Sequence, residues 1–132
     1  MSEPFIYIST WRVKEGKLEE LKQYYREIIE IVKEREPQLI AFHSFVNEEG
    51  TEMTSIQVHP HVASGDLHME VLGQAMQALV EKYSNVFELI EGKHIEYYGG
   101  PNERYLEMDR QLNIAVDIKP VHIGGFSRAT TG

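Results

Sequence analysis

The chain has 132 residues, which suits a single domain with its own core, and it has no cysteine, which excludes disulfides, thiolate metal sites and a cysteine nucleophile. Thirteen Lys and Arg against twenty-one Asp and Glu give a net charge of −8, so we expect no nucleic-acid partner. No apolar run approaches the roughly 18 residues that cross a bilayer, and the N-terminus has no signal-peptide pattern. We therefore expect a soluble, cytoplasmic protein with no membrane partner.

The beginning of the chain predicts a strand followed by an amphipathic helix. Residues 5–13, FIYISTWRV, are rich in β-branched and aromatic residues and hold no Gly or Pro, which is typical of a strand. After a short turn, apolar side chains recur over residues 17–36 at spacings of three and four, at Leu18, Leu21, Tyr25, Ile28 and Val32. We expect the helix to end before Pro37, which cannot continue it.

Two strand-like segments, residues 39–47 and 52–60, lie on either side of a turn and predict an antiparallel hairpin. If Glu49-Gly50 forms the loop, three pairs face each other on one side of the sheet: Ala41 with Val58, His43 with Ile56, and Phe45 with Thr54. This side is the more apolar one, so we expect the helices to cover it. The mixed opposite side, which holds Ile40, Phe42, Val46 and Met53, would then face a second subunit.

Helical spacing returns over residues 64–83, where one side carries His68, Leu72, Ala75, Leu79 and Tyr83. Ser64 or Asp66 is a suitable N-cap for this helix. Gly73 lowers its intrinsic stability and indicates close packing or a kink. Residues 93–100, KHIEYYGG, predict a fourth strand.

The C-terminal part of the chain gives weaker patterns. Residues 102–113 form a short charged segment that is suited to a helical turn, and residues 114–128 predict one or two strands that Pro120 interrupts. The last four residues, ATTG, are expected to fray. We therefore expect one domain over residues 1–132, with a core of about residues 4–98 and an extension of about residues 99–132.

The order strand, helix, strand, strand, helix, strand predicts an α+β fold of the ferredoxin-like, split βαβ type. In this fold an antiparallel sheet carries two helices on one face. The uncovered face is then an apolar surface, which pairing with a second copy would bury. The sequence thus predicts a homodimer in which two sheets pack face to face as a dimeric α/β barrel.

Two stretches resemble the antibiotic-biosynthesis-monooxygenase type of dimeric α/β barrel. One is FIYISTWRVKEGKLEELKQYY, a strand followed by a helix start. The other is the strand that ends near HPH and continues into SGDLHMEVLG, with a His at the head of the second helix. The resemblance covers about residues 4–98 and rests on patterns of a fold, not on a catalytic signature. The extension departs from the usual short form, and it either caps the pocket or exchanges with the partner subunit.

This resemblance implies a small enclosed pocket between sheet and helices. The family includes cofactor-free oxygenases of quinol- or anthrone-like aromatics, haem-degrading enzymes and proteins of unknown activity. The haem-degrading branch has an Asn near the end of the first strand, where this chain has Tyr7, Ser9 and Trp11, so we expect no haem and no other cofactor. The leading hypothesis is a cofactor-independent monooxygenase that acts on a small hydrophobic aromatic or quinol-type compound. The alternative is a ligand-binding or stress-response barrel without catalysis.

His68 and His43 are the candidate catalytic residues. Helical spacing turns His68 toward the sheet, where a neutral imidazole suits proton abstraction from a phenol or quinol. The hairpin register places His43 on the face that we assign to the helices, so both rings would converge in one pocket, although a one-residue slip would separate them. A structural histidine that is hydrogen-bonded within the core is the alternative for His68.

Tyr7, Ser9, Trp11 and Tyr97 are the candidate substrate-binding residues, because strand aromatics would form the walls of a pocket for a flat ligand and a small hydroxyl would orient a ligand oxygen. Core packing is the alternative for the aromatic residues. His59 and His61, joined by His68 or Asp66, offer a metal shell as a third hypothesis. We favour a solvated loop for that segment and predict no metal.

Overall fold

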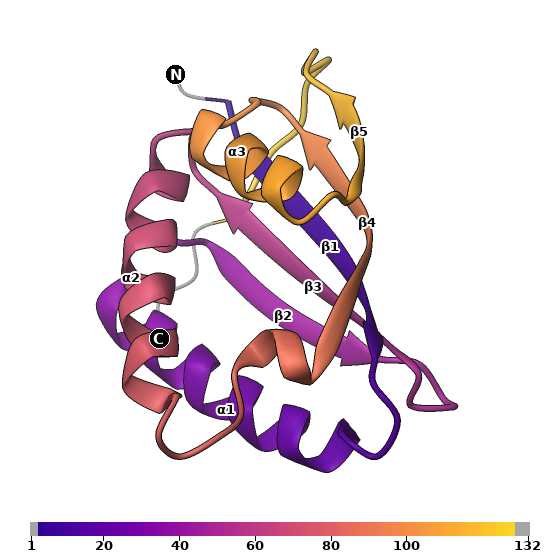
Figure 1. Cartoon of the computed structure of the whole chain (residues 1–132). Coiled ribbons are helices and arrows are strands. Elements are labelled where there is room, and N and C mark those ends of the chain that lie inside the picture. Colours follow the sequence, from indigo (N-terminus) through magenta and orange to yellow (C-terminus); the bar gives the residue numbers. More distant parts are fainter. Residues whose placement is uncertain (1–2, 129–132) are drawn as a thin grey trace.

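The computed structural model describes residues 3–128, and its elements follow the predicted order with a helix and a strand added at the end (Figure 1). The strands are β1 (Phe5–Val13), β2 (Ala41–Val46), β3 (Glu52–His59), β4 (Ile90–Tyr98) and β5 (Ala115–Lys119). The helices are α1 (Leu18–Arg35), α2 (Ser64–Leu79) and α3 (Glu103–Gln111), with a 3₁₀ turn, η1 (Val86–Glu88), before β4.

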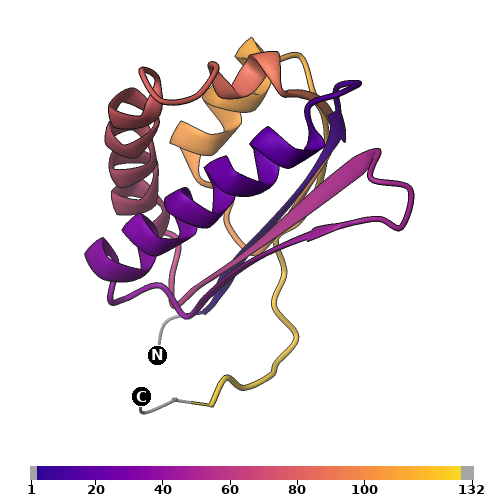
Figure 2. The same ribbon diagram turned by 90° about the horizontal axis from the view of Figure 1, so that it is seen from below.

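The five strands form one sheet in the order β2-β3-β1-β4-β5. The first four strands pair antiparallel, which confirms the ferredoxin-like split βαβ arrangement, whereas β5 pairs parallel to β4 at the edge. Figure 2 shows α1, α2 and α3 on one side of this sheet and the segment after β5 on the other side. The sheet therefore has a helix-covered face and an open face.

Regular spacing explains the two long helices. The buried residues of α1 are Leu21, Tyr24, Ile28 and Val32, so Tyr24 occupies the buried position that the sequence assigned to Tyr25. On α2 the buried stripe runs through His68, Val71, Ala75 and Leu79. The predicted side-chain cap is absent from α2, because the Ser64 hydroxyl contacts His59 and Gln38 instead of the helix backbone.

The hairpin register is the predicted one, but the predicted face is wrong. His43 pairs with Ile56 and Phe45 pairs with Thr54, as expected. The helices, however, cover the alternate residues of β3, namely Met53, Ser55, Gln57 and His59, all of which are buried. His43 is consequently exposed on the open face and does not converge with His68. The prediction chose the more apolar side as the buried one. It was wrong because the polar residues of the side that is in fact buried are largely satisfied by hydrogen bonds to each other and to neighbouring elements.

The open face carries Ile56 and Val58, which the sequence placed on the helix-covered side, together with two aliphatic residues of β1. Ile6, Ile8, Ile56 and Val58 lie on it, partly exposed, in adjacent positions of β1 and β3. Exposed apolar residues also follow β5, at Val121, Ile123 and Phe126. Pro120 ends β5, as expected from its missing N–H, and the predicted frayed tail, residues 129–132, lies outside the described residues. Among residues 3–128, no helix is long and apolar enough to cross a membrane.

Candidate functional site

A cavity of about 310 Å³ lies between the helix-covered face of the sheet and the helices. Most of its wall is aromatic or aliphatic, and a few polar side chains interrupt that wall. Exposed lining residues mark its mouth, which lies between α2 at Gly73, η1 at Phe87 and α3 at Gln111. A volume at the lower end of the usual range for ligand pockets indicates a small ligand.

Gly73 does not mark close packing of α2 against a neighbour, which was one of the two predicted reasons for this glycine. A Cβ atom built at this residue would meet nothing within 4 Å. The glycine instead leaves space at the mouth of the cavity, where a larger side chain would narrow the opening.

Three of the four predicted substrate-binding residues line this cavity. Tyr7, Ser9 and Trp11 alternate along β1 on the helix-covered face, and each forms part of the wall. Tyr97 is different: it is fully buried in a neighbouring cluster with Phe5 and Tyr105, and it is not among the lining residues. The sequence missed this difference because α3, which covers that end of the sheet, was not assigned as a full helix.

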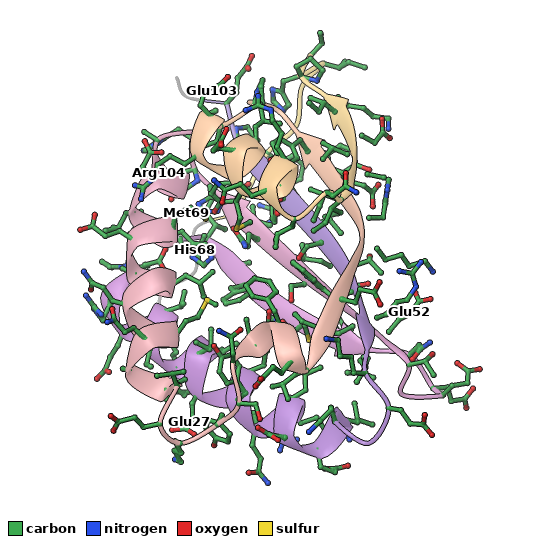
Figure 3. The ribbon with its side chains drawn as sticks, viewed as in Figure 1. Glu27, Glu52, His68, Met69, Glu103 and Arg104 are labelled. Carbon is green, nitrogen blue, oxygen red and sulfur yellow. The ribbon has the colours of Figure 1, made fainter. Side chains whose placement is uncertain are left out.

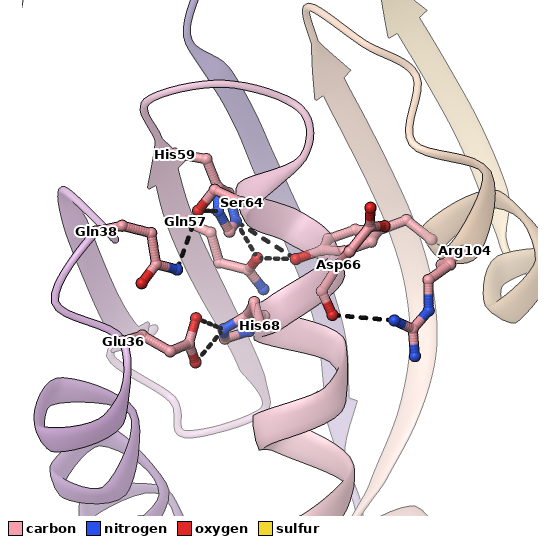
Figure 4. Close-up of polar contacts among 9 residues, drawn as sticks. Glu36, Gln38, Gln57, His59, Ser64, Asp66, His68 and Arg104 are labelled. Carbon is pink, nitrogen blue, oxygen red and sulfur yellow. Dashed lines mark hydrogen bonds and ion pairs between the residues drawn. The ribbon is translucent and has the colours of Figure 1, made fainter.

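The central polar contact of the site joins His68 of α2 to Glu36, which follows the end of α1. The His68 Nδ1 atom lies 2.9 Å and 3.1 Å from the two carboxylate oxygens of Glu36, and both side chains are fully buried (Figure 4). A carboxylate only accepts hydrogen bonds, so the Nδ1–H donates, and in the neutral tautomer of this ring the lone pair lies on Nε2. In Figure 3, His68 and its neighbour Met69 extend from α2 toward the sheet, whereas Glu27, Glu52 and Glu103 lie at the periphery.

The other nitrogen of His68 has no hydrogen-bond partner among residues 3–128, although it is buried. His68 forms part of the cavity wall, and its ring packs edge-on against Phe42, with ring centroids 5.5 Å apart. A histidine that a carboxylate orients through Nδ1, and whose other nitrogen is unpaired beside a cavity, has the arrangement from which a general base can act.

His59 is a structural residue and not part of a solvated loop. Its Nδ1 accepts from the Ser64 hydroxyl at 2.8 Å, and its Nε2–H donates to Gln57 Oε1 at 2.9 Å. Tyr105 of α3 donates to the same Gln57 oxygen at 2.7 Å, which ties α3 to the sheet. Burial is the main cause that lowers the pKa of His59 to about 3, with a smaller effect of His68 and His61 whenever these are protonated, so the His59 ring is neutral.

These contacts weaken the metal hypothesis. Both nitrogens of His59 are used within the protein, and His61 is exposed on the loop. No group of three His, Cys, Asp or Glu side chains suited to a metal ion gathers within residues 3–128.

A buried aspartate holds α3 against the end of the cavity. The hydroxyls of Tyr7 and Tyr97 donate to the two oxygens of Asp109, at 3.1 Å and 2.5 Å respectively. Burial raises the pKa of the Asp109 carboxyl, and the two tyrosine hydrogen bonds oppose that rise. Because Met108 and Gln111 on the same helix line the cavity, this contact positions part of its wall.

Sequence reasoning missed Glu36 and Asp109, although each left a signal. Glu36 follows Ile28 and Val32 at intervals of four, so it continues the buried stripe of α1. Asp109 follows Tyr105 by four residues and shares its buried side of α3. An acidic residue at a position where the spacing calls for an apolar one indicates a buried partner.

Comparison with known proteins gives matches among solved structures only: no protein-family model and no curated protein matches the chain. The structure of MupZ from Pseudomonas fluorescens superposes with a TM-score of 0.59 at 20% sequence identity, and the match covers 96% of each chain. A protein from Shewanella oneidensis gives a TM-score of 0.57 at 23% identity, covering 74% of this chain and 91% of the other.

A protein from Bacteroides thetaiotaomicron, provisionally described as an antibiotic biosynthesis monooxygenase, gives a TM-score of 0.52 at 16% identity, covering 68% of this chain and 85% of the other. These similarities show a shared fold, and at that level they confirm the resemblance seen in the sequence. The match to MupZ spans nearly the whole chain, so it includes the α3 and β5 extension.

Proposed function

We propose that this chain is a cofactor-independent monooxygenase that acts on a small, hydrophobic, quinol-type aromatic, with His68 as the general base. The observation that carries the proposal is the buried His68–Glu36 contact, which leaves Nε2 without a partner at the wall of a largely apolar cavity. The shared fold with a protein described as an antibiotic biosynthesis monooxygenase supports it. A fold alone does not define a reaction, so the proposal depends on the site.

The reaction needs one base and molecular oxygen. His68 Nε2 removes the hydroxyl proton of the substrate, and the resulting electron-rich anion reduces O₂ with formation of a carbon–oxygen bond. The peroxide then loses water as its O–O bond breaks, which leaves a carbonyl at that carbon. The peroxide anion takes the proton back from His68 before water leaves, which regenerates the base. Overall, a phenolic C–OH and a ring C–H together with O₂ become two carbonyl groups and one H₂O, so oxygen is the oxidant.

Side chains around His68 have to adjust when a ligand enters, because the ring has no exposed surface. Met69 and Met76 line the cavity, and unbranched thioether side chains repack at low cost. The apolar wall excludes water from the anion, which strengthens its interaction with the imidazolium.

Oxygen uptake by purified protein tests this function. Naphthohydroquinones and anthrones are added in turn, and the uncatalysed oxidation is subtracted. His68→Gln is expected to lower the catalysed rate by at least about a hundredfold, which is the usual contribution of a general base. His43→Gln, a matched change on the open face, is expected to keep the rate of the unmodified protein.

Equal rates for the unmodified protein and His68→Gln would refute the role of His68. Binding of these compounds without any oxygen uptake would instead favour the second function class, a ligand-binding barrel without catalysis.

We also propose that the protein is a homodimer in which the open faces of two sheets pack together. The partly exposed Ile6, Ile8, Ile56 and Val58 support this, because a second copy would bury an aliphatic surface of this kind.

A further inference from the structure

Two polar nitrogens of the cavity wall lack a partner. They are His68 Nε2 and Trp11 Nε1. Within residues 3–128, no other buried side-chain nitrogen or oxygen atom lacks a hydrogen-bond partner. Both residues line the same cavity. An unpaired buried donor or acceptor destabilises the fold, so two such atoms in one wall point to a partner that the protein itself does not supply.

Three other polar side chains of the wall have hydrogen-bond partners within the protein. Ser55 shares a hydrogen bond of 2.8 Å with Ser44 of β2. The Gln57 side-chain oxygen accepts from both His59 and Tyr105. The Tyr7 hydroxyl donates to Asp109. The unpaired nitrogens of Trp11 and His68 therefore stand out from the other polar atoms of the cavity.

The two nitrogens differ in chemistry. The indole N–H of Trp11 is a donor only, whereas His68 Nε2 is an acceptor once Nδ1–H is directed at Glu36. A single ligand that satisfies both must offer an acceptor to Trp11 and a hydroxyl to His68.

The sheet places these two residues at different levels of the cavity. His68 packs on Phe42, which lies in register with Gln57 and, through it, with Tyr7 of β1. Trp11 lies four residues further along β1, which corresponds to about 13 Å at the usual strand rise. One flat ring system with polar groups at its two ends is suited to this separation.

We propose that Trp11 and His68 hold opposite ends of one flat ligand, with the Trp11 N–H donating to a carbonyl oxygen and a ligand hydroxyl donating to His68 Nε2. This inference rests on the proposed function and narrows its substrate class to aromatic compounds that carry a hydroxyl at one end and a carbonyl at the other. Trp11 thereby determines specificity and orientation, while the hydroxyl that loses its proton is the one at His68.

A set of four compounds on one skeleton tests the two ends separately. They are a hydroxytetralone with its hydroxyl and carbonyl at opposite ends, the tetralone without the hydroxyl, the tetrahydronaphthol without the carbonyl, and tetralin with neither. Calorimetric titration of the full chain is expected to show about tenfold weaker binding for each polar group removed, the effect of one hydrogen bond.

Variants assign each end to a residue. Trp11→Phe is expected to abolish the preference for the carbonyl and keep the preference for the hydroxyl. The double variant Glu36→Gln/His68→Met avoids leaving a buried carboxylate unpaired. It is expected to abolish the preference for the hydroxyl and keep the preference for the carbonyl. The matched control is Phe87→Leu, which changes the apolar wall beside Trp11 without removing an N–H. This control is expected to weaken the binding of all four compounds by a similar factor.

The unmodified protein gives a second readout if the Trp11 variant fails to fold. Trp11 is the one tryptophan of the chain, so its fluorescence reports on this residue alone. The two carbonyl compounds are expected to shift its emission, and the other two are not. Equal shifts with all four compounds, or a Trp11→Phe variant that keeps the carbonyl preference, would overturn the assignment.

These outcomes are separate from the test of catalysis. If the two-ended binding pattern holds but no compound consumes oxygen, the proposed function fails and the binding assignment stands. If oxygen is consumed and Trp11→Phe keeps the preference for the carbonyl, the binding assignment fails and the proposed function stands.

Discussion

Glu36 shows how one residue changes the chemistry of its neighbour. Without it, His68 would be a buried ring on an apolar stripe, free to adopt either tautomer. With its carboxylate 2.9 Å from Nδ1, the neutral ring carries its proton on that atom and its lone pair on the other. The sequence alone identified His68 through helical spacing, but Glu36 became recognisable only once the end of α1 was seen to face the start of α2.

His59 should make the protein less stable in mild acid. Its folded pKa is about 3, below the ordinary value of 6.5, so the unfolded chain binds a proton that the folded chain does not. The contribution of His59 to stability is therefore present above pH 6.5 and is lost as the pH falls toward 3. Between about pH 7.5 and pH 5 the loss should be about 2 kcal/mol.

Urea unfolding at both pH values measures this effect. His59→Asn should remove most of the pH-dependent loss, although it lowers stability at neutral pH. His122→Asn, the same change at an exposed histidine that follows β5, should behave as the unmodified protein does. A pH dependence that is the same in all three proteins would contradict the assigned role of His59.

At the scale of elements, α3 covers one side of the pocket. Its residues Met108 and Gln111 line the cavity, and it is fastened to the sheet by Tyr105 and Asp109. The strand positions and the hairpin register followed from alternation and turn residues. The identity of the buried face could not be predicted in this way, because the sequence pattern shows which residues are apolar but not which polar residues have hydrogen-bond partners in the core.

Removing the carboxylate of Asp109 should destabilise this arrangement. Asp109→Ala leaves the hydroxyls of Tyr7 and Tyr97 buried without their acceptor, so we expect a loss of about 2 kcal/mol or more in the free energy of unfolding. The matched control is Glu107→Ala on the exposed side of the same helix, which should change stability by at most about 0.5 kcal/mol. Denaturant titration compares the two variants, and equal effects would show that Asp109 does not hold α3.

At the scale of the whole molecule, the two faces of the sheet carry different kinds of residues. The helix-covered face carries the cavity and its polar contacts, whereas the open face carries Ile6, Ile8, Ile56 and Val58. The sequence predicted that the face without helices packs against a second copy. The open face of the structure is a suitable surface for this contact, although the prediction had chosen the opposite face.

A charge at the centre of the open face tests the proposed dimer. Sedimentation of the unmodified protein should give a mass near twice the 15.3 kDa of one chain. Ile56→Lys should give monomers, because pairing would bury an uncompensated charge. Gln77→Lys, on the exposed side of α2, adds the same charge elsewhere and should remain dimeric. A monomeric unmodified protein would contradict the proposal.

The protonation of His68 is the central claim, and a ¹H–¹⁵N correlation spectrum of the histidine side chains measures it directly. The signals of His68, assigned by their absence in His68→Gln, should show that the neutral ring carries its proton on Nδ1 and none on Nε2. Glu36→Gln should disturb this pattern, and the hydroxytetralone should shift the Nε2 signal. A proton found on Nε2 of the free protein, or a signal unaffected by ligand, would contradict a general base facing the cavity.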